Sequence, residues 1–515
     1  MRIHPNIDRR TLLMSGAALL ASGASAHAQS ANSADDDFRA LVERLADRSR
    51  SSRAFLLRRY DASRLSPRGR ILYEAILPGA EADADLARMR WGRTGNPYAV
   101  THRYGAYRRA AELRPDDYFR TLVRAVDRET RQMLADADRG VIAPDFALAS
   151  TEPAVAQAAQ RVAERGNERE LAEALQRQLE AVQALRARAG SDPGMWRLPD
   201  GDDFYGAALQ FHLGAPVDPR AAHERALDRC RDLQAEADTL LRAQGLTRGG
   251  VGERLRALAR DPRFLYSSDD AGKDRAVAEM AERLARVRVL LADVIADAAT
   301  TPADMRRLPA NLEANGAAGR RRGTAYEVDL SAPRASWTLP SVVHHELIPG
   351  HIYQAPFANA ASVPMLQERY ANGYLEGWST YAEVLAAEHG AFEGDPLGRI
   401  GYLQWMLFRM ARVVADTGVH ALHWSREHAI AQMQQLQGES IAFVSIEEDV
   451  LRFCVQPGFY TAQGLAALHI EDLRERTRRE TRDRFSLQRF HTAMLEHGPL
   501  SPPGLDQAAR AAFGT

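Results

Sequence analysis

Residues 344–354 read HHELIPGHIYQ, and the interpretation of the whole chain depends on this stretch. A zinc hydrolase helix written H-E-x-x-H sets two histidines four residues apart, so both rings can bind one ion while the glutamate acts as base. His345 and Glu346 fit that pattern, but the next histidine, His351, comes six residues after His345. Six residues turn an ideal helix by about 240°, so the two rings could not share a metal on a regular helix.

Pro349 and Gly350 lie between the two histidines. Proline inside a helix removes a hydrogen bond and kinks the chain, and glycine tolerates the unusual dihedral angles that follow. We therefore expect a bulge of two residues that brings His351 back toward His345. The alternative is that both histidines are ordinary polar residues.

A third ligand is available in residues 373–383, which read GYLEGWSTYAE with helical periodicity. Glu376 and Glu383 lie seven residues apart on one face, so one can bind a metal while the other supports a ligand. Glu376 is the predicted ligand. We expect one Zn²⁺ per chain, held by His345, His351 and Glu376. Without a metal, the two glutamates would form a solvated helix face.

Three motifs in this order resemble the bacterial domain-of-unknown-function 885 family: HE-x-x-PGH-x-x-Q, EGW-x-x-Y-x-E, and RMARVVADTGVHALHW at residues 409–424. An upstream segment, FYGAALQFHLGAPVDPRAAHERAL at residues 204–227, is also similar to the family. The resemblance therefore covers most of the chain after its first residues. It implies a helical, zincin-like metallopeptidase whose substrates are poorly defined.

The chain departs from this family at several positions. Leu347 stands where the family often has glycine, and Ile352 stands where it often has a second histidine. A single candidate histidine therefore follows the Pro-Gly pair. Phe459 replaces a frequent glutamine, and Gln463-Gly464 replace a tyrosine–lysine pair. The resemblance therefore implies no functional role for Phe459, Gln463 or Gly464.

Residues 1–28 have the features of a twin-arginine export signal. Arg9-Arg10 precede an apolar run, and Ala26-His27-Ala28 provides an A-x-A cleavage site. We expect the twin-arginine export machinery as a partner and a periplasmic or secreted product. No cysteine follows the signal directly, which argues against a lipid anchor. No later apolar run reaches the roughly 20 residues needed for stable membrane insertion.

The charge balance is close to neutral. The net charge is −1 at pH 7, and removal of residues 1–28, with three arginines and one aspartate, leaves −3. A nucleic-acid partner is not expected, because no basic excess attracts one. Lys273 is the only lysine, so Schiff-base chemistry is excluded elsewhere. Cys230 and Cys454 either pair in an oxidising compartment or remain buried thiols.

Most of the mature chain has helical patterns. Residues 153–189, 219–244 and 274–298 carry Ala, Leu, Arg and Glu at spacings of three and four. Residues 324–330, TAYEVDL, alternate like a strand, and an edge strand beside the active helix could pair with an extended substrate. The preceding GRRRG at residues 319–323 is expected to be a flexible, solvated loop.

The predicted fold is therefore mainly α, a multi-helix zincin-like metallopeptidase with a small β element beside the active-site helix. We expect a helical N-terminal half at residues 29–300. The C-terminal half, residues 301–515, holds the metal site, and the two halves form one catalytic fold with a cleft.

The chemistry expected of such a site is hydrolysis. Glu346 is the predicted base that takes a proton from water and passes it to the leaving amine. His420 and Tyr460 are the candidate donors to the developing oxyanion, His420 because it matches a family motif and Tyr460 because it follows Pro457-Gly458. The alternative for each is packing, with His420 held by Asp416.

Arg412 and Arg452 are predicted to bind a substrate carboxylate through paired hydrogen bonds, as a carboxypeptidase or dipeptidase would require. The alternative is that both pair with neighbouring acids. The leading function is an exported zinc-dependent hydrolase of peptide or small amide substrates. A non-catalytic metal- or peptide-binding protein of the same fold, and a zinc hydrolase of a non-peptide amide or ester, stay open. An intact Glu346 argues against the first of these alternatives.

Overall fold

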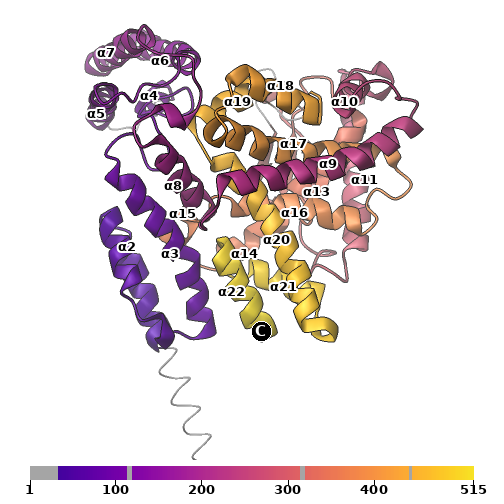
Figure 1. Ribbon diagram of the computed structural model, residues 1–515. Coiled ribbons are helices and arrows are strands. Elements are labelled where there is room, and N and C mark those ends of the chain that lie inside the picture. The colour runs from indigo at the N-terminus through magenta and orange to yellow at the C-terminus, as the bar shows by residue number, and fades with distance from the viewer. Residues whose placement is uncertain (1–32, 113–118, 167, 314–318, 440–443, 515) are drawn as a thin grey trace, which may run out of the picture.

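The computed structural model describes residues 33–112, 119–166, 168–313, 319–439 and 444–514. The predicted export signal lies outside these residues. The described chain is built mainly of helices with one small sheet, which confirms the predicted class (Figure 1). Among the described residues, no helix is both long and apolar enough to cross a bilayer.

The first group of helices encloses its own apolar cluster, which runs from Phe38 to Phe211 and includes Tyr370 from a later segment. Residues 33–45 are helical. The elements that follow are α2 (Arg50–Arg58), η1 (Ala62–Arg64), α3 (Pro67–Arg88), α4 (Ala106–Ala111), α5 (Phe119–Ala137), α6 (Asp145–Arg165), α7 (Arg169–Arg186), η2 (Met195–Arg197) and α8 (Gly201–Leu213).

The second group contains the remaining elements and the only described sheet. They are α9 (Pro219–Ala243), α10 (Val251–Ala259), η3 (Pro262–Phe264), α11 (Asp270–Leu290), β1 (Asp304–Arg307), α12 (Ala310–Glu313), β2 (Arg320–Arg322), β3 (Ala325–Val328), η4 (Ser336–Thr338), α13 (Leu339–Glu346), α14 (His351–Ala360), α15 (Met365–Arg369), α16 (Tyr374–Glu388), α17 (Pro396–Ala421), α18 (Arg426–Gln437), α19 (Ile446–Val455), α20 (Phe459–Thr481), η5 (Arg482–Arg484), α21 (Leu487–Leu495) and α22 (Pro502–Phe513).

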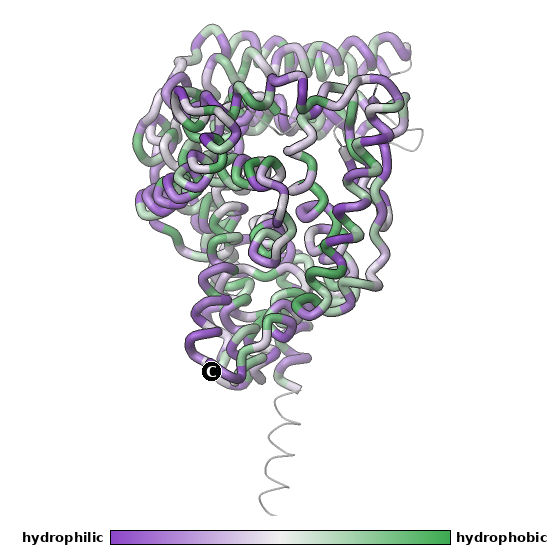
Figure 2. The backbone as a smooth tube through the Cα atoms, turned by 90° about the vertical axis from the view of Figure 1, so that its right-hand side faces the viewer, coloured by the Kyte–Doolittle hydropathy of each residue, from purple (hydrophilic) through white to green (hydrophobic). Residues whose placement is uncertain are grey.

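Amphipathic patterns explain most of these helices. In α5 the buried residues Leu122, Val126, Met133 and Ala137 recur at intervals of four and seven, as one helical face requires. Figure 2 shows the same alternation of hydrophilic and hydrophobic residues along many helices. The pattern at residues 153–189 is interrupted, because Gly166 adopts a left-handed conformation that ends α6 before α7 begins.

The second apolar cluster runs from Leu209 to Phe513 and also takes Ile71 and Ala75 from α3. The two clusters therefore divide within α8, near residue 210, whereas the predicted division is at residue 300. Helix α9 packs along α17 across that predicted boundary. The division at residue 300 stays a prediction.

The sheet has the strand order β1-β3-β2. β3 pairs with β1 in parallel and with β2 in antiparallel orientation. The strand predicted at residues 324–330 is confirmed, but it is the central strand and not an edge. The flexible loop predicted at residues 319–323 is wrong, because Arg320–Arg322 form β2 at one edge of the sheet.

Helices α13, α16 and α17 pack against one another within the second group, and their labels lie together in the centre of Figure 1. α16 also packs along α20. α13 carries the predicted ligand His345, α16 carries Glu376, and His351 begins the short helix α14, which contacts both α13 and α16.

Candidate metal centre

The HELIPGH motif forms a turn between two helices. α13 ends at Glu346 and α14 begins at His351, so the predicted bulge within one continuous helix is wrong. Leu347 leaves the helical conformation with φ −109° and ψ −95°, and the Ile348–Pro349 peptide is cis. The indole N–H of Trp378 in α16 donates to the Pro349 carbonyl at 2.9 Å. A helix end fixed by a distant side chain therefore replaces the bulge.

The turn returns His351 to His345, as the sequence predicts. Their ring centroids lie 4.9 Å apart, with the planes at 89°. His345 Nε2 lies 3.3 Å from Glu376 Oε2, and His351 Nε2 lies 3.4 Å from Glu376 Oε1. One ligand atom from each of the three residues lies within 4.8 Å of the others. Ligands at about 2.0–2.1 Å from a tetrahedral Zn²⁺ are about 3.3–3.4 Å apart, so the two histidine–glutamate separations match those around one ion.

Gly350 occupies a position with no room for a side chain. A Cβ atom there would lie 1.8 Å from the carbonyl oxygen of His345 and 2.5 Å from that of His344. Both atoms belong to the backbone of α13, so neither can move aside without disturbing the adjacent histidines. The close approach explains why glycine stands before His351.

We expect Gly350→Ala to destabilise the protein by about 3 kcal/mol, the upper end of ordinary overpacking, because the new methyl group pushes α14 away from α13. Urea unfolding measures this change. Gly206→Ala in α8 is the control, since its Cβ would meet no atom within 4 Å and alanine favours a helix. Equal stability of Gly350→Ala and the wild type would contradict the close approach.

Glu383 supports His345 from the side opposite Glu376. Its Oε1 lies 2.9 Å from His345 Nδ1, and its Oε2 accepts a hydrogen bond from the Ser341 hydroxyl. Glu383 and Ser341 are fully buried. A carboxylate on one ring nitrogen fixes the orientation of the ring and leaves the other nitrogen for a metal.

The electrostatics of the cluster favour a cation. Burial opposes protonation of His345, and so does Arg409, but the carboxylates of Glu376 and Glu383 outweigh both and raise its pKa to about 9. Burial alone would raise the pKa of Glu376, yet the two histidines hold it well below its usual value. The buried Glu383 carboxylate and the partly exposed Glu376 carboxylate, 31% exposed, therefore face two imidazole rings at one point.

His351 Nε2 is a buried polar atom without a hydrogen-bond partner among the described residues. Its 3.4 Å approach to Glu376 is close enough for electrostatic attraction but lacks hydrogen-bond geometry. An unsatisfied buried acceptor costs about 1–3 kcal/mol, and a metal ion between the two side chains would remove that cost. The residues present therefore fit a metal ion.

A cavity of about 360 Å³ adjoins the cluster. His345, Glu346 and Glu376 line it together with apolar side chains that include Trp405 and Phe408. Glu346 stays near the surface, with 15% of its side chain exposed, and pairs with Arg321 Nη1 of β2 at 2.7 Å. The predicted base thus lies beside the ligands without being one of them.

Arg412 and Arg452 line the same cavity, but both pair with acids. Arg412 makes two hydrogen bonds to the buried Asp449 carboxylate, at 2.9 and 2.8 Å. Arg452 Nε donates to Glu448 at 3.1 Å. Since the Arg412 fork is occupied by the protein itself, the alternative of pairing with neighbouring acids describes these residues better than substrate binding.

His420 lies in the core, which corrects its predicted role as oxyanion donor. Its Nδ1 accepts the Met195 N–H at 3.1 Å, and its Nε2 lies 3.1 Å from the Phe453 carbonyl oxygen. Burial lowers its pKa to about 3. Both ring nitrogens are used by the backbone, so the ring joins η2 to α19 and has no donor left for a substrate.

Tyr460 also has a packing role and does not line the cavity. Its ring lies 4.6 Å from the Arg412 guanidinium and contacts the rings of Phe453 and Phe459. Cys230 and Cys454 are both buried free thiols, so the disulfide alternative is not realised.

Arg409 is the cluster residue that sequence reasoning missed. Its Nη2 lies 3.1 and 3.2 Å from the two ring nitrogens of His345 and 3.5 Å from Glu383 Oε1. The one signal available was its position at the start of the family-like segment RMARVVADTGVHALHW. The sequence of that segment does not indicate which arginine, Arg409 or Arg412 one turn further along α17, lies beside the candidate ligands.

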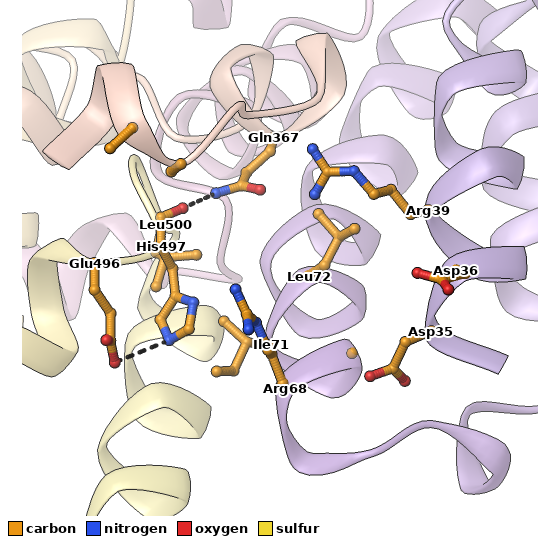
Figure 3. A pocket seen from close by; sticks show the side chains of 13 residues that line it. Asp35, Asp36, Arg39, Arg68, Ile71, Leu72, Gln367, Glu496, His497 and Leu500 are labelled. Carbon is orange, nitrogen blue, oxygen red and sulfur yellow. Dashed lines mark hydrogen bonds and ion pairs between the residues drawn. The ribbon is translucent and has the colours of Figure 1, made fainter. Parts of the chain in front are cut away.

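A larger pocket of about 590 Å³ lies away from this cluster. Its lining combines acidic, basic and apolar side chains, among them Asp35, Arg39, Arg68 and His497 (Figure 3). Among the described residues, only His345, His351 and Glu376 form a group with metal-ligand spacing. The chemistry of the lining, and not the size of the pocket, therefore selects the candidate site.

Two solved structures resemble the fold over 93% of the chain. "The putative lipoprotein from Colwellia psychrerythraea" aligns with a TM-score of 0.75 at 23% identity, over 93% of this chain and 91% of that chain. A "putative lipoprotein of unknown function from Shewanella oneidensis" aligns with a TM-score of 0.67 at 17% identity, over 93% and 99%. At these identities the likeness shows the fold alone.

No curated protein matches the sequence. The family described as "Bacterial protein of unknown function (DUF885)" matches residues 106–508, which is well over half of the chain and includes the HELIPGH turn, α16 and α17. The chain therefore belongs to the DUF885 family of bacterial proteins of unknown function.

Proposed function

We propose that this protein is an exported zinc-dependent hydrolase of peptide or peptide-like amide bonds, with a zincin-like arrangement of its active site. The observation that carries the proposal is the meeting of His345, His351 and Glu376 beside a cavity that His345, Glu376 and Glu346 line. Two imidazoles and one carboxylate form a donor set typical of catalytic zinc, which keeps a fourth position open.

Zn²⁺ bound by these residues would supply Lewis acidity, which polarises a carbonyl oxygen and makes water more acidic. The buried and unpartnered His351 Nε2 supports this assignment. Glu383 supports it as well, because a carboxylate behind His345 fixes the tautomer that a metal ligand needs.

Glu346 is suited to move the proton. Amide hydrolysis bonds a water oxygen to the carbonyl carbon while Glu346 accepts a proton from that water. The C–N bond then breaks, and Glu346 returns the proton to the leaving nitrogen, so a carboxylic acid and an amine are the products. The ion pair with Arg321 orients the ionised Glu346 carboxylate at the cavity wall before it accepts the proton.

The proposal is tested with purified mature protein by elemental analysis and a screen of short peptides. About one zinc per chain and cleavage of a subset of the peptides are the expected results. Absence of bound metal would remove the zinc assignment. Full zinc occupancy with no cleavage of peptides, amides or esters would favour the non-catalytic binding protein.

Glu383→Gln is expected to weaken zinc binding by about 10- to 100-fold, because the neutral amide orients His345 less firmly than the carboxylate does. Competition with a chelator measures the affinity. Glu388→Gln on the same helix is the matched control, since Glu388 pairs with Arg474 and is absent from the cluster. Unchanged zinc affinity in Glu383→Gln would show that this carboxylate does not support the ligand.

We also propose export through the twin-arginine route to the periplasm or beyond. The sequence of residues 1–28 supports the route, and the names of the two structural relatives support export alone, since lipoproteins are exported proteins. Replacing Arg9-Arg10 with two lysines should leave the precursor in the cytoplasm, as cell fractionation would show. Normal recovery of the variant outside the cytoplasm would point to the general secretory route.

A further inference from the structure

Arg409 lies in the middle of α17, directly beside the candidate metal ligands. Only 11% of its side chain is exposed. Its guanidinium packs near the rings of Trp405, at 5.5 Å, and Phe408, at 5.4 Å. These contacts hold a permanently charged group at the wall of the cavity.

One end of the guanidinium is anchored over His345. Nη2 is almost equally distant from the two ring nitrogens, at 3.1 and 3.2 Å. A C–H group lies between those nitrogens in the ring plane, so an equal approach within the plane would clash with it. Nη2 therefore lies over the ring face. The in-plane positions stay open to Glu383 on one side and to a metal on the other.

The other end of the Arg409 guanidinium has N–H groups that can donate to a substrate. Nη1 lies 3.8 Å from Glu376 Oε2, which is beyond hydrogen-bond distance, and no acceptor for it occurs within the described part of the chain. Arg412 differs, because its guanidinium already makes two hydrogen bonds to Asp449. Arg452 pairs with acids alone, because its Nε donates to Glu448 and its Nη1 lies 3.8 Å from Asp449 Oδ1, whereas Arg409 contacts the candidate ligand His345.

Glu346 and Arg409 thus line one cavity together with two of the candidate metal ligands, His345 and Glu376. Glu346 provides a carboxylate that can take a proton, and Arg409 provides a positive charge with free N–H groups. Amide hydrolysis needs both, because the carbonyl oxygen becomes negatively charged when water adds to the carbon. A donor already in place in a site with little water stabilises that charge without reorganisation.

We infer that Arg409 is a catalytic residue whose Nη1 donates a hydrogen bond to the substrate carbonyl oxygen as its negative charge develops. Arg409 takes the role that sequence reasoning gave to His420 and Tyr460. The inference rests on the proposed hydrolase function and adds to it the residue that stabilises the oxyanion.

The test compares Arg409→Gln with Arg399→Gln, a control on the same helix whose side chain pairs with Glu236. With a peptide that the wild type cleaves, kcat of Arg409→Gln should fall by about 10²- to 10³-fold, with little change in KM. Its zinc content and zinc affinity should equal those of the wild type. The Arg399→Gln variant should keep both its kcat and its zinc.

A binding measurement supplies a readout that needs no turnover. Inorganic phosphate is a tetrahedral anion, and calorimetry should show that it binds the zinc-loaded wild type and Arg399→Gln alike. Loss of one charge-assisted donor, worth about 1.5–3 kcal/mol, should weaken phosphate binding to Arg409→Gln by at least 10-fold. No phosphate binding to the zinc-loaded wild type, or equal binding to Arg409→Gln, would overturn the inference.

The remaining outcomes separate this role from its alternatives. Joint loss of zinc affinity and activity in Arg409→Gln would mean that Arg409 only orients His345 and Glu383, and the inference would fail. If the glutamine variant does not fold, Arg409→Lys is tested in its place, because lysine keeps the positive charge. Arg409→Lys should bind zinc as the wild type does, and its kcat should be at least about 10-fold lower than that of the wild type. A wild type without zinc or hydrolysis would refute the proposed function before any variant is made.

Discussion

Replacing Glu346 with glutamine is expected to leave the protein folded and zinc-loaded while hydrolysis falls by roughly 10³- to 10⁴-fold. Glu346 lines the cavity but does not belong to the three-residue ligand group, so its loss should not release the metal. The same carboxylate serves both proton transfers, which places the loss at the upper end of general-base effects. Turnover of a cleaved peptide and bound zinc are measured on the same samples.

Two further variants serve as comparisons for Glu346→Gln. Glu164→Gln, on the exposed face of α6, should match the wild type in both measurements. Glu376→Gln should lose zinc first and activity as a consequence, because its carboxylate is the predicted third ligand. Near-normal turnover of Glu346→Gln would refute the proposed mechanism and return attention to the binding-protein alternative.

Substitution of either predicted histidine ligand should lower hydrolysis as much as Glu346→Gln does, but in this case because zinc is lost. His345→Ala and His351→Ala each remove one of three protein ligands, so zinc should be lost on purification and activity should fall with it. Elemental analysis of the purified variants measures this loss.

His344→Gln is the matched control for the two ligand substitutions. His344 precedes His345 in the sequence, but its ring packs against Phe392, and burial lowers its pKa to about 4. This variant should keep its zinc. Full zinc in both ligand variants, or loss of zinc only in His344→Gln, would show that the ligands have been assigned to the wrong residues.

The meeting of His345, His351 and Glu376 could be predicted from sequence because each belongs to a short motif whose spacing restricts its partners. The form of the turn between His345 and His351 could not be predicted in this way. Proline and glycine permit a bulge, a kink or a helix end alike, and the choice depends on contacts from elsewhere. The Trp378 hydrogen bond to Pro349 and the contact of Gly350 with the α13 backbone are such contacts.

Arg409 was missed for a related reason. It lies 64 residues after His345, and only the packing of α17 on α13 brings the two together. The chain contains 66 arginines, so residue type alone selects none of them.

His420 was misassigned because α17 is buried on all sides over residues 410–420. Arg412, Asp416 and His420 recur at intervals of four, a spacing that resembles an exposed helix face although all three are buried. The periodicity therefore could not tell a cavity side chain from a core side chain.

The sheet shows where pattern recognition works and where it fails. The apolar alternation of residues 324–330 predicted β3, whose four residues are all buried. The three arginines of β2 have exposed side chains and no alternation, so they resembled a loop. β2 is a strand because β3 offers it an antiparallel backbone partner, and backbone pairing is independent of side-chain pattern.

The most direct test of the metal centre is anomalous X-ray diffraction at the zinc absorption edge, from crystals of the purified mature protein. The predicted result is one strong peak per chain, bounded by His345 Nε2, His351 Nε2 and the Glu376 carboxylate. No peak at that position, or a peak held by other residues, would contradict the account.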